Sequence, residues 1–134
     1  MKHALPVAMV MLILAGRSSA LAHHSHPNFL LDQEVSIEGD LVELKYANPH
    51  VLLKIRTADG VVYTAEWQAA SWLLSHAHVT LSTLRVLDHV IVSGAPSRDP
   101  ESHELVQLKE VRRPIDGWTY RVIQNKPVEP SSKR

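Results

Sequence analysis

Residues 34–46 alternate between polar and apolar side chains, and this feature constrains the fold of the chain more than any other. A two-residue period of this kind is typical of a half-buried β-strand. The apolar set changes phase after Gly39, from Val35, Ile37 and Gly39 to Val42, Leu44 and Tyr46. A slip of one residue at a glycine is typical of a β-bulge. The pattern therefore predicts one long strand that bends at Gly39.

A β-hairpin is predicted to follow this strand. Asn48-Pro49 ends the first strand, because proline lacks an amide hydrogen and asparagine forms side-chain turns. Residues 51–56 and 61–67 then alternate again, and Asp59-Gly60 between them is a strong hairpin signal. We expect the inward side chains to be Val51, Leu53 and Ile55 on one strand and Tyr63, Ala65 and Trp67 on the other.

The second half of the chain predicts one helix and two more strands. Residues 69–77 lose the two-residue period and are rich in Ala and Leu, which favours a short helix with Trp72, Leu73 and His76 toward its buried side. Residues 90–94 and 105–111 are the next predicted strands, and 118–123 is a candidate edge strand.

The order of these elements predicts the fold class. Three strands that begin with a long bent one, a short helix after the third strand, and two further strands are typical of a five-stranded OB-like Greek-key barrel. We therefore expect a mostly β, single-domain protein. An open β-sandwich of the same strands is the alternative.

The amino terminus has the three parts of a secretory signal peptide. Lys2 is the positive head, residues 4–16 are the apolar stretch, and Ala20-Leu21-Ala22 fits the small-residue cleavage site. The apolar stretch is about 13 residues, whereas a spanning helix needs about 20. We therefore expect cleavage near Ala22 and a periplasmic protein with no membrane association after cleavage. The expected divisions are a signal at 1–22, a His-rich leader at 23–33, the barrel at 34–123 and a disordered tail at 124–134.

Composition and motifs exclude several classes of function. Without Lys2 and Arg17, the mature chain has 12 basic and 14 acidic residues, so its net charge is near −2. This charge gives no basis for binding nucleic acid or anionic lipid. The chain has no cysteine, no G-x-S-x-G, no H-E-x-x-H and no glycine-rich phosphate loop. Glu38, Glu43 and Glu66 are expected to face solvent. We therefore predict that the protein is not an enzyme.

Three short motifs resemble those of a family of small exported bacterial proteins known only as a domain of unknown function. They are Ala22-His23-His24-Ser25, Asn48-Pro49-His50 and Glu66-Trp67. The chain departs from the family pattern twice, with Asp88-His89 where Gly-Asp is usual and His26 where an aromatic residue is usual. The resemblance implies a bacterial periplasmic β-barrel domain and supplies no activity.

The histidines of the leader predict a metal site. If cleavage follows Ala22, the α-amine and Nδ1 of His23 can chelate one metal ion, with His24 and His26 within reach and His50 as a further donor. Nitrogen-rich ligation without sulfur suits Cu(II). We therefore expect a periplasmic protein that binds Cu(II) as a carrier, buffer or accessory.

Two less specific interpretations stay open at this point. In one, the His-rich leader is a flexible polar segment and His50 only completes a turn. In the other, the protein is a metal-free interaction module whose face with Tyr46, Tyr63 and Trp67 receives a small ligand or an unknown periplasmic partner. The sequence does not indicate the oligomeric state.

Overall fold

The computed structural model of the 134-residue chain describes residues 26–123 and 126–128. The predicted signal peptide lies outside the described residues. No helix in the described ranges is both long enough and apolar enough to cross a membrane. The elements are β1 (Val35–Lys45), β2 (Leu52–Arg56), β3 (Val62–Glu66), α1 (Ala70–Ala77), β4 (His89–Pro96), β5 (Glu104–Arg113), β6 (Trp118–Ile123) and β7 (Lys126–Val128).

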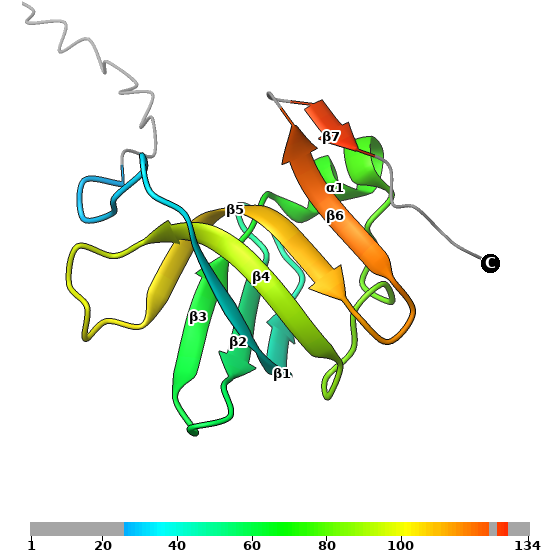
Figure 1. The fold of residues 1–134 in the computed structure, drawn as a ribbon. Coiled ribbons are helices and arrows are strands. Elements are labelled where there is room, and N and C mark those ends of the chain that lie inside the picture. Colours follow the sequence, from blue (N-terminus) through cyan, green and yellow to red (C-terminus); the bar gives the residue numbers. More distant parts are fainter. Residues whose placement is uncertain (1–25, 124–125, 129–134) are drawn as a thin grey trace, which may run out of the picture.

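The first five strands close into a barrel (Figure 1). The sheet order is β3-β2-β1-β4-β5-β6-β7, and a parallel pairing of Thr64 with Glu104 and of Ala65 with Leu105 joins β3 to β5. This pairing removes both free edges of the five-stranded unit. The prediction of a small five-stranded barrel with one short helix after the third strand is confirmed.

The bend in β1 lies slightly later than predicted. The register between β1 and β2 shifts between Leu41 and Glu43, so the bulge is at Val42. Gly39 has a different role, because a Cβ at this position would collide with the backbone of Arg56. The prediction that Gly39 marks the bulge is therefore wrong: a glycine needed for close backbone approach leaves a similar sequence signal.

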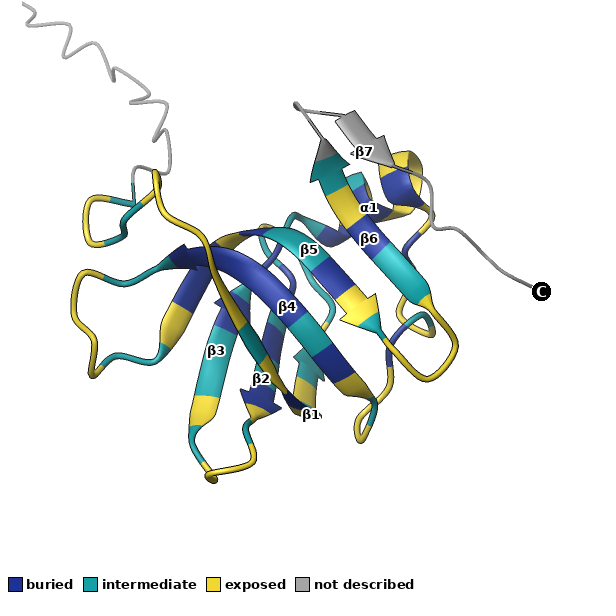
Figure 2. Cartoon of the chain, in the orientation of Figure 1, coloured by how far each residue is buried: buried dark blue, intermediate teal, exposed yellow. Residues whose placement is uncertain are grey.

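Buried residues lie on every strand of the closed unit (Figure 2). The side chains of this core are apolar. Val51, Leu53 and Ile55 have no exposed surface, as their alternation predicts. Trp67 and Tyr120 are also buried, and their rings meet edge to face at a centroid distance of 4.9 Å. Burial of apolar surface, without disulfides, thus stabilises the fold.

Helix α1 packs against the barrel core through Ala70, Leu73 and Ala77. Tyr46 contacts the backbone near both ends of this helix. The Tyr46 hydroxyl donates to the carbonyl oxygen of Val79 (2.8 Å) and lies 3.1 Å from that of Ala70. Leu73 is buried as expected, whereas His76 is exposed and stacks on Trp72. The placement of His76 on the buried side was therefore wrong; the small side chains of Ala70 and Ala77 take that side instead.

The candidate edge strand at 118–123 forms as β6, antiparallel to β5. The segment predicted as a disordered tail contains β7, which pairs with β6 through Ile123 and Lys126.

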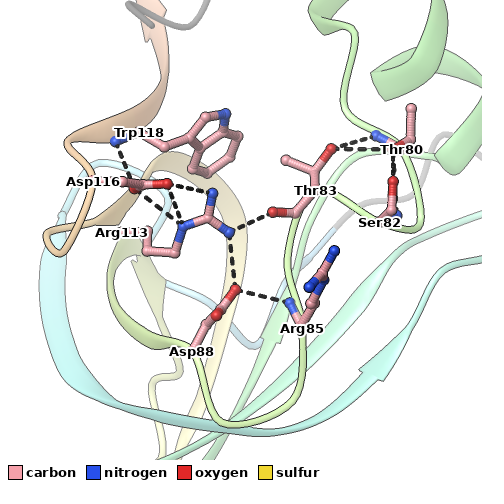
Figure 3. Close-up of polar contacts among 8 residues, drawn as sticks. All are labelled: Thr80, Ser82, Thr83, Arg85, Asp88, Arg113, Asp116 and Trp118. Carbon is pink, nitrogen blue, oxygen red and sulfur yellow. Dashed lines mark hydrogen bonds and ion pairs between the residues drawn. The ribbon is translucent and has the colours of Figure 1, made fainter. Parts of the chain in front are cut away.

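Arg113, at the end of β5, joins the β5–β6 hairpin to the loop before β4 (Figure 3). Its guanidinium donates to the Asp116 carboxylate (2.8 to 3.1 Å), to Asp88 Oδ2 (3.0 Å) and to the Thr83 carbonyl oxygen (2.6 Å). It also lies 5.8 Å from the ring centroid of Trp118. The hydrogen bonds from Arg113 hold the pKa of Asp116 below its usual value.

Candidate functional site

His50 lies in the connection between β1 and β2, after the cis Asn48–Pro49 peptide. Its Nδ1 atom is 3.2 Å from the carbonyl oxygen of Trp67 and 3.4 Å from Oε1 of Glu66. Because a carbonyl oxygen only accepts hydrogen bonds, Nδ1 carries the proton and donates it. The lone pair of the neutral ring is then on Nε2, which is the form in which a backbone-oriented imidazole ligates a metal.

The described part of the leader, residues 26–33, is fastened to the connection between β4 and β5 (Figure 1). The amide of Arg98 donates to the carbonyl of Asn28 (2.8 Å), and its side chain donates to the carbonyl of Pro27 (3.0 Å). Leu30 donates to the carbonyl of Pro96 (2.9 Å). The partners of these hydrogen bonds are more than 65 residues away along the chain. Tertiary hydrogen bonds therefore define the position of this part of the leader.

These contacts place His26 beside the barrel. Its Nε2 lies 3.7 Å from Oε1 of Glu66, and its ring meets that of Phe29 edge to face at 5.7 Å. The His26 side chain is 16% exposed, so most of its surface is covered. A distance of 3.7 Å is an ion-pair contact and is too long for a hydrogen bond.

Glu66, the last residue of β3, joins the two histidines through one carboxylate oxygen. Its side chain is 25% exposed. Glu66 points outward as expected but is only partly exposed, because His26 of the leader lies against it. The alternation along β3 gave its direction correctly but contains no information about what covers that face. Its presence in the Glu66-Trp67 motif was the signal that marked it.

A cavity of about 350 Å³ opens beside these three side chains. It is lined by His26, His50, Glu66, Trp67, Gln68, Gln107, Lys109 and Val122. Polar groups from the leader, from the β1–β2 connection, from the end of β3 and from β5 therefore converge on one space. Convergence of a few polar side chains on a concave, partly apolar space is typical of binding sites for small ligands.

The structure brings together two of the four predicted metal ligands. His26 and His50, 24 positions apart in sequence, meet at Glu66. His23 and His24 lie outside the described residues. Among residues 26–123 and 126–128, no group of three or more His, Asp or Glu side chains is arranged to hold a metal ion. The metal site therefore stays a prediction, of which the structure shows only that His26 and His50 lie near each other.

The other histidines have different surroundings. His76 stacks on Trp72, His78 ends α1 in the left-handed conformation, and His103 contacts the ring of Tyr63. His89 begins β4 and bonds to Asp40 (2.8 Å) and Glu38 (2.9 Å). These hydrogen bonds, first that to the Glu38 carboxylate, raise the pKa of His89.

The aromatic face proposed for a metal-free ligand is mostly occupied. Trp67 is 2% exposed, and the Tyr46 hydroxyl binds backbone carbonyls near α1. Burial raises the pKa of Tyr120.

Comparison with known proteins gives a family. The sequence profile described as "Family of unknown function (DUF6152)" matches residues 10–107, which is most of the chain and extends from the amino-terminal segment into β5. The chain belongs to this family. The expected membership of a domain family of unknown function is thereby confirmed. No curated protein and no solved structure matches the chain.

Proposed function

We propose that the mature protein is a periplasmic Cu(II)-binding protein that acts as a carrier, buffer or accessory. Its ligands are the α-amine and imidazole of His23, with His24 or His26 and with His50. The observation that carries this proposal is the convergence of His26 and His50 on Glu66, because it fixes the end of the His-rich leader beside a histidine of the barrel.

The length of chain before His26 fits this site. His23 is three positions away, and three residues span at most about 11 Å. The amine of a chain that starts at His23 is therefore within reach of the cluster around Glu66. The carbonyl oxygen of Trp67 supports the site by accepting the Nδ1 proton of His50, since a backbone carbonyl behind a ligating histidine fixes the orientation of the ring.

The choice of copper rests on ligand chemistry. The donors are nitrogens, and the mature chain has neither cysteine nor methionine, because all three methionines precede residue 12. Among the first-row divalent metal ions, Cu(II) binds nitrogen donors most tightly. The metal-free interaction module has less support, because Tyr46 and Trp67 are engaged in the fold.

The test is a copper titration of the mature protein beside a variant with one alanine added before His23. The insertion keeps every side chain and removes the chelate formed by the amine and imidazole of one residue. We expect it to weaken Cu(II) binding by about tenfold or more, which corresponds to at least about 1.4 kcal/mol. Intact mass of protein from the periplasm checks that the chain begins at His23.

His50→Ala is the second variant, and His78→Ala is its matched control because His78 is exposed at the end of α1. We expect His50→Ala to weaken copper binding and His78→Ala to leave it unchanged. The proposal is contradicted if the mature protein, the alanine insertion, His50→Ala and His78→Ala all bind Cu(II) with equal affinity. It is also contradicted if the mature protein binds no copper with a Kd below about micromolar.

A further inference from the structure

The cavity beside Glu66 has a second wall, which is built by an irregular part of β5. The pairing of β4 with β5 shifts register between Ser93 and Ala95, and Gln107 lies in the bulged part with φ of 52°. Gly94 permits this arrangement, because a Cβ there would lie 2.8 Å from the carbonyl oxygen of Val106. A non-glycine residue in the left-handed region is strained, and bulges of this kind often direct a side chain into a site.

The bulge carries Gln107 and Lys109 to the lining of the cavity, where Gln68 joins them from the segment between β3 and α1. The side-chain amides of Gln68 and Gln107 make no hydrogen bond to other described groups. Lys109 has a long contact to Glu34, with 3.8 Å between Nζ and Oε2. Gln68, Gln107 and Lys109 therefore line the cavity with N–H groups that can donate hydrogen bonds to a ligand.

One permanent cation lies at this wall of the cavity. It is Lys109, and Gln107 precedes it by two positions on the same strand, β5. Glu66, the one acidic side chain that lines the cavity, is approached by both histidines. Val122 adds apolar surface, which suits the carbon part of a small ligand.

We propose that this cavity binds the carboxylate of a small organic acid through Lys109, Gln107 and Gln68, with the carbon part of the ligand against Val122. A charged amine and two amides provide charge-assisted and neutral hydrogen bonds to one carboxylate. The volume of about 350 Å³ accommodates a short-chain acid. The site goes beyond the proposed copper site and does not need copper, because its donors are different residues.

The test uses the metal-free mature protein and propionate as the probe. Nuclear magnetic resonance should follow the side-chain amides of Gln68 and Gln107 and the indole of Trp67 during titration. We expect saturable shifts with propionate and at least tenfold weaker binding of propionamide, which has the same shape without the charge. Saturable binding of propionamide with equal affinity overturns the proposal.

Two variants separate this site from a general effect of charge or fold. Lys109→Met should abolish the saturable shifts, whereas Lys45→Met, on an exposed position of β1, should leave them unchanged. Gln107→Gly should weaken propionate binding while it raises the midpoint of urea unfolding, because glycine relieves the left-handed strain. Equal propionate binding by the wild type and Lys109→Met contradicts the assignment, whatever the copper titration shows.

Discussion

The Arg113 cluster and the Glu66 cluster both join distant segments of the chain, but they differ in how completely their polar groups are satisfied. All three guanidinium nitrogens of Arg113 donate hydrogen bonds, at 2.6 to 3.1 Å. Around Glu66 the contacts with the two histidines are 3.4 and 3.7 Å long, and a cavity lies beside them. The first arrangement is typical of a structural connection, whereas the second has space and donors for a ligand.

The largest predicted effect on the free energy of unfolding comes from removing Arg113, the centre of the structural cluster. Arg113→Ala leaves Asp88, whose side chain is 22% exposed, and the Thr83 carbonyl without their partner. We expect the free energy of unfolding to fall by about 3 kcal/mol, measured by urea denaturation. Arg121→Ala is the control, because its pair with Glu110 is at the surface and should contribute less than about 1 kcal/mol. Equal losses in the two variants would contradict the structural role of Arg113.

The loop that Arg113 holds contains a strained residue that glycine should relieve. Leu87 has φ of 78° and is 79% exposed, so its side chain contributes little packing there. We expect Leu87→Gly to raise the free energy of unfolding by about 0.5 to 1 kcal/mol, after allowance for the greater freedom of glycine in the unfolded chain. Leu81→Gly is the control: Leu81 is also exposed but its φ is not positive, so we expect no stabilisation.

The residue after Leu87 is held by this loop. Asp88 accepts hydrogen bonds from the Arg85 amide and from Arg113.

The candidate ligand site should tolerate substitution better than the Arg113 cluster does. We expect Glu66→Ala to change the free energy of unfolding by less than about 1 kcal/mol, because the ion pairs of Glu66 are long and partly exposed. Urea denaturation of the metal-free protein measures this effect. A loss as large as that of Arg113→Ala would show that the Glu66 cluster is a structural element of the same kind.

The smallest expected effect concerns pH. His89 is bonded to Glu38 and Asp40, and Arg56 lines the same surface hollow. Because the folded pKa of His89 is raised above 6.5, its contribution is fully present below pH 6.5 and is lost as pH rises through the folded pKa. We expect a few tenths of a kcal/mol, since both ion pairs are exposed. Unfolding of His89→Gln at pH 6 and pH 8.5 should lack this difference.

The fold was more predictable from sequence than the site, for a physical reason. Alternation reports which face of a strand is buried, so the burial of Val51, Leu53 and Ile55 and the succession of strands along the chain followed from it. The contact of His26 with Glu66 depends on the leader bending back to Arg98, through backbone hydrogen bonds that carry no side-chain pattern. The bulge at Gln107 was missed for the same reason, because its neighbours keep an ordinary strand composition.

The most direct test of the central claim is pulsed electron paramagnetic resonance of the mature protein loaded with one Cu(II). The method counts the imidazoles that are coupled to copper. We expect more than one coupled imidazole in the wild type and one fewer in His50→Ala, with an unchanged spectrum for His78→Ala. A spectrum that does not change in His50→Ala would contradict a site shared between the leader and the barrel.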